Sequence, residues 1–259
     1  MDINFTDKVV VITGAEGGIG SAMVKKFAEN GAQVAICDLN CKGDLEKELK
    51  ENGNIVKSFS FNVSNKDETL EAMKQIAEEF GKIDILVNNA GINVGADERK
   101  TIEHFSDKWW DAITAVDLDG VFNCSKSAIP YMTGENASII NISSITGMVP
   151  LRNQCAFAAA KAGVINLSKA MAIELAPKGI RVNVVCPGSI GIAITNNTLW
   201  REASAMEGLL SHIPMGRQGQ ACEIADATMF LGSEMATYIT GAVLPVDGGW
   251  TCGGFARDF

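Results

Sequence analysis

Short apolar runs that alternate with amphipathic stretches constrain the fold of this chain more than any other feature of its sequence. Mostly apolar runs of strand length occur at residues 8–13, 33–38, 55–63, 83–88, 138–143, 180–186 and 242–246. Strands that are apolar along their length and separated by helices form parallel sheets with helices on both faces. The pattern therefore predicts an α/β protein, with one doubly wound domain over residues 1–259 and a parallel sheet of about seven strands.

Helix boundaries follow from apolar spacing and from residues that begin or end helices. Ser64 and Asp67 have the spacing of a capping box and predict a helix start there. The pattern between residues 107 and 132 predicts two helices, over 107–116 and 118–132. A long helix over 153–176 is expected to end before Pro177. Residues 189–215 have weaker periodicity, and we interpret them as a substrate loop region.

The turn after the first apolar run is rich in glycine. Residues 13–20 read TGAEGGIG and lie between a predicted strand and a predicted helix. Such glycines let backbone N–H groups approach a pyrophosphate at the helix N-terminus, although glycine can also serve only the geometry of the turn. Asp38 ends the second strand, at the position of an acid that binds adenosine ribose hydroxyls. The succession of strand, turn, helix, strand and acid favours a Rossmann-type dinucleotide site.

Asp38 also indicates which dinucleotide binds. A carboxylate at this position repels the 2′-phosphate of NADP, which other members of this fold bind with an arginine. The neighbours Cys37 and Leu39 offer no cation, and the glycine-rich turn carries the acidic Glu16. We therefore expect NAD rather than NADP. The alternative is that Asp38 is only a solvated residue at a strand end.

Four segments together resemble the short-chain dehydrogenase/reductase family over nearly the whole chain. They are the turn at residues 13–20, the sequence NNAG at 88–91, the serine and lysine of ISS…AFAAAK at Ser144 and Lys161, and the dipeptide Pro187-Gly188. The resemblance implies that Asn62 and Val63 flank the adenine, and that the Ile190 backbone lies near the nicotinamide carboxamide. The cofactor-binding residues that it implies are Thr13, Gly14, Glu16, Gly18, Ile19, Gly20, Asp38, Leu39, Asn62, Val63, Asn89, Ala90, Gly91, Lys161, Pro187, Gly188 and Ile190.

The family's chemistry requires a tyrosine that this chain lacks. In the family, a tyrosine phenol exchanges a proton with the substrate, and a lysine four residues later lowers its pKa. Here Lys161 is present, but position 157 holds Phe157. Phe157 is either an engineered replacement or the natural residue of a degenerate family member. An acid–base group typically contributes about 10²–10⁴-fold, so we expect NAD binding with slow or undetectable turnover.

Two further residues complete the predicted catalytic set. Ser144 matches the family serine that hydrogen-bonds the substrate oxygen. Asp117, in the sequence VDL, occupies the place of an asparagine that anchors a water in a proton relay. An ionised aspartate accepts hydrogen bonds but cannot donate them. The resemblance thus implies Ser144, Phe157, Lys161 and Asp117 as the catalytic positions.

Composition excludes several other classes of function. The formal net charge of −9 is opposite to the basic footprint of a nucleic-acid-binding protein and disfavours anionic membranes. Seven cysteines without a Cys-x-x-Cys pair, and only two histidines, predict neither a metal site nor a disulfide framework. Without a signal peptide or a long apolar run, we expect a cytoplasmic protein.

The substrate is predicted from the loop at residues 189–214. This segment is rich in apolar residues, and its only basic residue is Arg201, which argues against a strongly anionic substrate. It suits a secondary alcohol or ketone on an apolar, cyclic or steroid-like body. The leading hypothesis is an NAD-dependent oxidoreductase, and the alternative is a natural non-catalytic NAD-binding protein. Resemblance to the family also implies a homotetramer or homodimer formed through the helices near 118–132 and 153–176.

Overall fold

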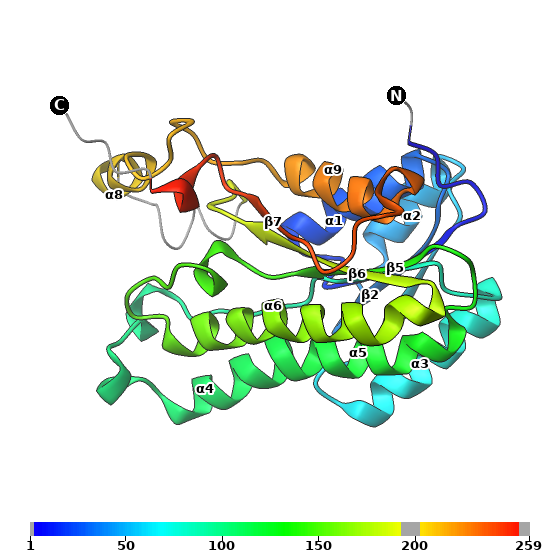
Figure 1. Ribbon diagram of the computed structural model, residues 1–259, viewed down its shortest axis with the longest axis horizontal. Helices are drawn as coiled ribbons and strands as arrows, with labels where there is room; N and C mark the ends of the chain where they lie inside the picture. Colours follow the sequence, from blue (N-terminus) through cyan, green and yellow to red (C-terminus); the bar gives the residue numbers. More distant parts are fainter. Residues whose placement is uncertain (1–2, 193–202, 254–259) are drawn as a thin grey trace.

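A seven-stranded parallel sheet forms the centre of the protein, as the sequence predicts. The computed structural model describes residues 3–192 and 203–253. The strand order is β3-β2-β1-β4-β5-β6-β7, which extends the usual Rossmann order by one strand (Figure 1). The strands are β1 Val9–Thr13, β2 Gln33–Asp38, β3 Val56–Ser60, β4 Ile85–Asn88, β5 Ala137–Ile142, β6 Ile180–Pro187 and β7 Val243–Val246.

Helices cover both faces of the sheet (Figure 1). One face carries α1 (Gly18–Glu29), α2 (Asp44–Glu51) and α9 (Ala221–Gly232). The other carries α3 (Lys66–Phe80), α4 (Asp107–Thr114), α5 (Gly120–Ala128) and α6 (Cys155–Leu175). The side chains of β1 alternate between the two layers, because Val10 and Ile12 join the core under α1 while Val11 joins the core under α3. A further helix, α8, spans Ala203–Leu210.

The chain reverses its direction of strand addition at β1. From β1 it proceeds outward to β2 and β3, and it then returns to place β4 on the other side of β1. Connections at the carboxyl ends of β1 and β4 therefore diverge to opposite faces of the sheet. In doubly wound folds, the crevice between such diverging connections is where ligands bind.

The two helices predicted between residues 107 and 132 are present as α4 and α5, but a π-helical turn at Ala115–Asp119 joins them without a break, and α5 ends at Ala128. The predicted cap of α3 is wrong. The start of α3 is capped by Asn65 rather than Ser64. The Asn65 side chain accepts hydrogen bonds from the N–H groups of Asp67 at 3.1 Å and Glu68 at 3.3 Å. The Ser64 hydroxyl instead donates to the Asn62 side chain.

The segment Cys155–Lys178, which contains α6, is long and apolar enough to cross a membrane by length and composition alone. Its apolar side chains have a place in the folded protein, however. Val164, Met171 and Leu175 are buried, and Met171 and Leu175 belong to the core between the sheet and α3 and α5. Packing in this core accounts for the apolar composition of α6.

Candidate active site

A cleft of about 580 Å³ opens beyond the carboxyl ends of β1, β2, β3 and β4. The structure brings twelve of the predicted cofactor-binding residues together around it. They are Gly14, Glu16, Gly18, Ile19, Gly20, Asp38, Leu39, Asn62, Val63, Asn89, Ala90 and Gly91. We refer to this site as the nucleotide cleft.

The glycines of the first turn are needed for its close contacts. Gly14 has a φ of +63°, and a Cβ atom there would lie 2.8 Å from the Ala90 Cα. A Cβ atom on Gly20 would lie 2.1 Å from the Gly14 carbonyl oxygen. Within residues 3–192 and 203–253, no side chain caps the N-terminus of α1, so its first N–H groups stay open at the cleft. The turn therefore fits the pyrophosphate of a dinucleotide.

Asp38 is held at the edge of the nucleotide cleft by the backbone. Its carboxylate accepts hydrogen bonds from the N–H groups of Glu16 at 3.0 Å and Leu39 at 2.8 Å. Lys42 also lines this cleft, and the sequence prediction missed it. Its backbone N–H donates to the Glu16 carboxylate at 3.3 Å. Two carboxylates and one exposed lysine thus surround the place expected for the adenosine ribose.

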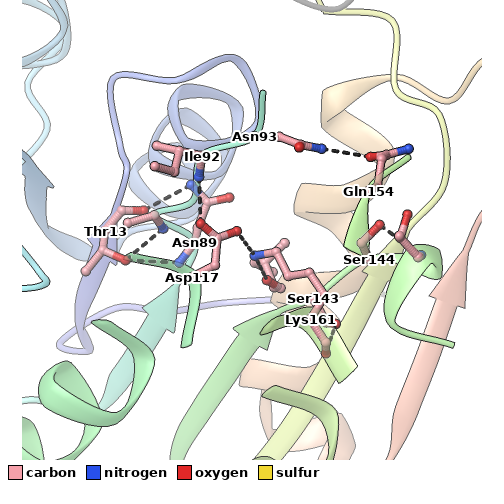
Figure 2. Close-up of polar contacts among 12 residues, drawn as sticks. Thr13, Asn89, Ile92, Asn93, Asp117, Ser143, Ser144, Gln154 and Lys161 are labelled. Carbon is pink, nitrogen blue, oxygen red and sulfur yellow. Dashed lines mark hydrogen bonds and ion pairs between the residues drawn. The ribbon is translucent and has the colours of Figure 1, made fainter. Parts of the chain in front are cut away.

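Thr13 lies beneath the nucleotide cleft and does not line it. This residue is buried, and its hydroxyl accepts hydrogen bonds from the N–H groups of Asn89 at 3.0 Å and Ala90 at 3.1 Å (Figure 2). The Asn89 amide donates in return to the carbonyl oxygens of Thr13 and Gly14, both at 3.0 Å. Thr13 therefore positions the loop after β4, whose residues Asn89 and Ala90 line the nucleotide cleft.

A second cleft, of about 540 Å³, continues from the nucleotide cleft toward the carboxyl ends of β5 and β6. We call it the substrate cleft. All four predicted catalytic residues line it, together with Pro187, Gly188 and Ile190. Five residues line both clefts: Ile19, Asn89, Gly91, Ile92 and Ile192.

A buried ion pair lies at the junction of the two clefts. The Lys161 Nζ atom lies 3.1 Å from Asp117 Oδ2 and donates to the Ile142 carbonyl oxygen at 3.2 Å (Figure 2). The other carboxylate oxygen of Asp117 accepts the Ile92 N–H at 2.8 Å. Burial raises the pKa of Asp117, while the Lys161 ammonium and the Ile92 N–H act in the opposite direction. Two of the three ammonium hydrogens of Lys161 are thereby engaged, and one remains for a ligand.

The π-helical turn positions Asp117 for this pair. Asp117 lies in the middle of the turn and is fully buried, whereas Asp119, two residues later, is exposed. A π-turn adds one residue to the helical repeat and is frequent at functional sites. The sequence alone did not indicate it.

Ser144 and Phe157 face the substrate cleft from different elements. The Ser144 hydroxyl oxygen accepts the Thr146 N–H at 3.1 Å and donates to no other group in the part of the chain that the structure describes. Phe157 lies one turn before Lys161 on α6, with its ring centroid 5.6 Å from Lys161 Nζ. Neither of the chain's two tyrosines, Tyr131 and Tyr238, lines either cleft.

The sequence prediction also missed residues of the substrate cleft beyond Gly91, among them Asn93, Val94 and Arg99. They belong to the loop that follows β4, immediately after the NNAG segment. The Asn93 amide donates to the Gln154 side chain at 2.9 Å, which fastens this loop to the start of α6 (Figure 2). Extending the search beyond Gly91, at a carboxyl strand end, would have found these residues.

The predicted substrate loop is described only in part. Ile190 and Ile192 line the substrate cleft, and Leu209 and Ile213 are buried. Residues 193–202, which include Leu199, Trp200 and Arg201, lie outside the described residues. Within the described chain, no group of three or more histidine, cysteine, aspartate or glutamate side chains could hold a metal ion.

Comparisons with known proteins agree with this arrangement. A family model described as enoyl-(acyl carrier protein) reductase matches residues 14–251. The 3-oxoacyl-[acyl-carrier-protein] reductase FabG of Thermotoga maritima is 40% identical over 246 residues, covering 93% of this chain and 97% of that protein. The 2,5-dichloro-2,5-cyclohexadiene-1,4-diol dehydrogenase LinX of Sphingobium indicum is 39% identical over 251 residues, covering 95% of this chain and 97% of that protein.

Two further comparisons cover similar lengths. The cis-4-hydroxycyclohexanecarboxylate dehydrogenase of Sinomonas cyclohexanicum is 36% identical over 249 residues, covering 95% of this chain and 98% of that protein. The crystal structure of gox2181 superposes with a TM-score of 0.91 at 32% identity and covers 96% of this chain and 97% of that one. With the parallel sheet, the glycine-rich turn and the joined clefts, these matches establish that the chain belongs to the short-chain dehydrogenase/reductase family of oxidoreductases.

Proposed function

We propose that this protein transfers a hydride between NAD(H) and a secondary alcohol or ketone, and that Phe157 makes the chain as given slow. The observation that supports this most is the junction of the two clefts. Five residues line both of them, so a dinucleotide in the first would reach the edge of the second. Ser144 and Lys161 line the second cleft at the positions expected for substrate and ribose contacts.

The preference for NAD is argued from charge. A 2′-phosphate at the adenosine ribose would meet the carboxylates of Asp38 and Glu16, both of which line the nucleotide cleft. Lys42 is exposed and offers only a screened counter-charge. Ribose hydroxyls, by contrast, can donate hydrogen bonds to Asp38. We therefore infer that NADH binds more tightly than NADPH.

The protein's own part in the reaction is to orient groups and move a proton. NAD, when bound, supplies the hydride chemistry. The Ser144 hydroxyl oxygen already accepts one N–H, which leaves its hydrogen free to donate to a substrate oxygen. Lys161 has one ammonium hydrogen left for the nicotinamide ribose. Phe157 has no proton to exchange, so the step that a phenol would catalyse has no partner at this position.

For the substrate, we propose a ketone or secondary alcohol on an apolar, cyclic frame. Apolar side chains from three segments line the cleft, including Val94, Phe157 and Ile190. Two of the relatives above are named as dehydrogenases of six-membered carbocycles. Their names support a cyclic frame over the acyl-carrier substrates of the other relative. A steroid-like body remains within the same proposal.

A non-catalytic role is the second candidate. Phe157 is the observation that favours it, because the ring fills the tyrosine's place without its hydroxyl. In that case the nucleotide cleft would serve as a sensor of NAD(H). The two candidates differ in whether restoring the hydroxyl restores turnover.

We also propose that the protein is a cytoplasmic homo-oligomer. All seven cysteines are unpaired, which fits a reducing compartment. The outer face of α6 carries small and apolar exposed residues, among them Ala159, Ala162 and Ile173. Such a face allows close approach of a helix from a second copy.

The variant Phe157→Tyr tests the proposed function. Titrations of NADH and NADPH should give the same NADH preference in both forms. Turnover on a panel of secondary alcohols should rise by about 10²–10⁴-fold in the tyrosine form. Phe105→Tyr, which adds a phenol outside both clefts, serves as the matched control. If Phe157→Tyr turns over no substrate of the panel, the non-catalytic role is supported. If NADPH binds more tightly than NADH, the assignment of Asp38 to the adenosine ribose is contradicted.

A further inference from the structure

Arg99 is a charged residue of the substrate cleft that has no partner among the residues that the structure describes. It follows a short 3₁₀ turn at Ala96–Glu98, and its side chain lines the cleft. Its Nε atom is buried without a hydrogen-bond partner. Within the described residues, no carboxylate lies within ion-pair distance of its guanidinium. Burial lowers the pKa of Arg99 from its ordinary value, as expected for a cation without a counter-charge.

Arg181 of β6 shows how this chain satisfies a buried guanidinium when its role is structural. Its Nε atom, like that of Arg99, has no hydrogen-bond partner, but both terminal nitrogens are bonded. One donates to the carbonyl oxygens of Leu231 at 2.8 Å and Ile239 at 3.3 Å, and the other donates to that of Ser233 at 3.4 Å. These bonds tie the end of α9 to the sheet. Arg99 makes no such bonds within the described chain. The partly buried guanidinium of Arg99 faces the cleft without such bonds, which favours a role in binding a ligand over a structural role.

The first part of the loop that carries Arg99 is fixed in place. The Ile92 N–H is bonded to Asp117, and the Asn93 side chain to Gln154. Val94 is buried in a small apolar cluster with Ile113 and Ala156. Three successive residues of the loop are thus anchored shortly before Arg99. A donor on an anchored loop loses less entropy when it binds a ligand.

The charges that line the substrate cleft leave Arg99 uncompensated. Lys161 is paired with Asp117, and among the described residues these two and Arg99 are the charged residues that line the cleft. The described lining therefore carries one excess positive charge. The planar guanidinium fork matches the two oxygens of a carboxylate.

From these observations we propose that Arg99 binds a carboxylate carried by the substrate, so that the preferred substrates are keto acids or hydroxy acids on a small apolar frame. This inference rests on the proposed function, because it assumes that Ser144 receives the reacting oxygen in the same cleft. Residues 189–214, whose composition disfavours an anionic substrate, do not include Arg99. Arg99 reaches the cleft from a different loop.

Binding of matched ligands to the NADH-saturated protein tests the proposal without requiring turnover. The probes are 4-oxocyclohexanecarboxylate and 4-oxopentanoate, each compared by calorimetry with its neutral carboxamide. We expect the acid to bind about 10–100-fold more tightly than the amide, which is the range for a charge-assisted hydrogen bond. Arg99→Gln should abolish this preference, and Arg99→Lys should keep only part of it.

Lys100→Gln is the matched control, because it removes the same charge from the adjacent, exposed residue. It should leave the preference for the acid unchanged. Equal affinity for acid and amide, an undiminished preference in Arg99→Gln, or no binding of either pair would overturn the proposal.

Failure of the carboxylate site and failure of the proposed function give different results. If acids bind through Arg99 but Phe157→Tyr turns over no substrate, the carboxylate site is supported and the proposed oxidoreductase function is contradicted. If Phe157→Tyr reduces neutral ketones but Arg99→Gln does not change the preference for the acid over the amide, the oxidoreductase function is supported and the carboxylate site is contradicted. In Phe157→Tyr, loss of Arg99 should raise KM for keto acids and leave KM for neutral ketones unchanged.

Discussion

Asp117 is subject to two opposing influences, and the balance between them can be measured. Burial disfavours its charged form, whereas Lys161 at 3.1 Å and the Ile92 N–H favour that form. Burial dominates, and the pKa in the folded protein lies above the ordinary value of 3.8. The family asparagine at this position would carry no charge. The aspartate thus adds a protonation equilibrium to the centre of the site.

Asp117→Asn should change the pH dependence of stability. With a raised folded pKa, the folded state keeps its proton at pH values where the unfolded chain has lost it. The contribution of Asp117 to the free energy of unfolding is therefore complete below about pH 4 and decreases as the pH rises through the folded pKa. The unfolding free energy of the wild type relative to Asp117→Asn should therefore fall as the pH rises from about 4 through the folded pKa. The expected fall is about 1.4 kcal/mol per unit of difference between the folded and unfolded pKa.

Urea unfolding of both proteins at a series of pH values measures this difference. Asp119→Asn, an exposed neighbour in the same π-turn, should show no such trend. A difference that grows with pH would mean that Lys161 outweighs burial and lowers the pKa of Asp117.

Gly91 lets the ion pair approach the junction of the clefts. A Cβ atom on Gly91 would lie 3.0 Å from Asp117 Oδ2 and 3.2 Å from Lys161 Nζ. Gly91→Ala should therefore displace the pair, lower the free energy of unfolding by about 1–3 kcal/mol and weaken NADH binding. Gly95→Ala is the matched substitution, because a Cβ there meets nothing within 4 Å. A thermal shift assay with and without NADH measures both effects. Equal melting temperatures and equal shifts with NADH for Gly91→Ala and Gly95→Ala would contradict this prediction.

At the scale of elements, the start of α9 depends on a capping box. The Glu223 carboxylate accepts the Gln220 N–H at 2.7 Å and pairs with the Arg217 guanidinium at 2.7 Å. The hydrogen bond from Arg217 is the main cause that lowers the pKa of Glu223 from 4.5 to about 2. Because the group is exposed, solvent screening limits its contribution to about 0.5–1 kcal/mol.

Glu223→Gln should therefore lose about 0.5–1 kcal/mol of unfolding free energy at pH 7. A lowered folded pKa means that the stabilisation is present above the unfolded value of 4.5 and is lost as the pH falls toward about 2. Urea unfolding of both proteins should show a smaller difference in unfolding free energy between the wild type and Glu223→Gln at about pH 3.5 than at pH 7. Glu174→Gln, on the exposed face of α6, should change stability at neither pH.

Elements with strong, continuous patterns were predictable, and irregular joins between them were not. The seven apolar runs became the seven strands, since a run buried on both faces has few alternatives. The π-turn at Ala115–Asp119 left no trace in the periodicity, because one additional residue is compatible with two helices or one. Asn65 rather than Ser64 caps α3, because the Asn65 side chain accepts hydrogen bonds from two N–H groups of the first helical turn at once.

The candidate site was predictable where a motif carries the contact. Gly14, Asp38 and Lys161 all lie where the motifs predict. Thr13 was assigned to the cofactor, but its hydroxyl is used by the backbone after β4. Arg99 could not be found in the same way, because its approach to the cleft depends on the path of the loop after β4 and on no local pattern.

At the scale of the whole molecule, the proposed self-association through α6 can be tested. Ile173 is 78% exposed there, and Ala162 is exposed on the same helix. If this face joins two copies, a double variant with Ala162→Glu and Ile173→Glu should run as a 27.5 kDa monomer in light scattering, while the unmodified protein has two or four times that mass. Ile55→Glu, exposed beside β3 at the edge of the sheet, is the control and should leave the mass unchanged. An oligomer that survives the double variant would assign assembly to another face.

The strand order has a consequence for how the protein is made. The strands β3, β2, β1 and β4 form one contiguous half of the sheet, and all of them precede residue 89. Among the described residues, every one that lines the nucleotide cleft lies between Gly14 and Val116, except Ile192. Ser144, Phe157 and Lys161 follow later in the chain. At synthesis rates of about 5–20 residues per second, the dinucleotide half leaves the ribosome seconds before the residues that would perform the chemistry.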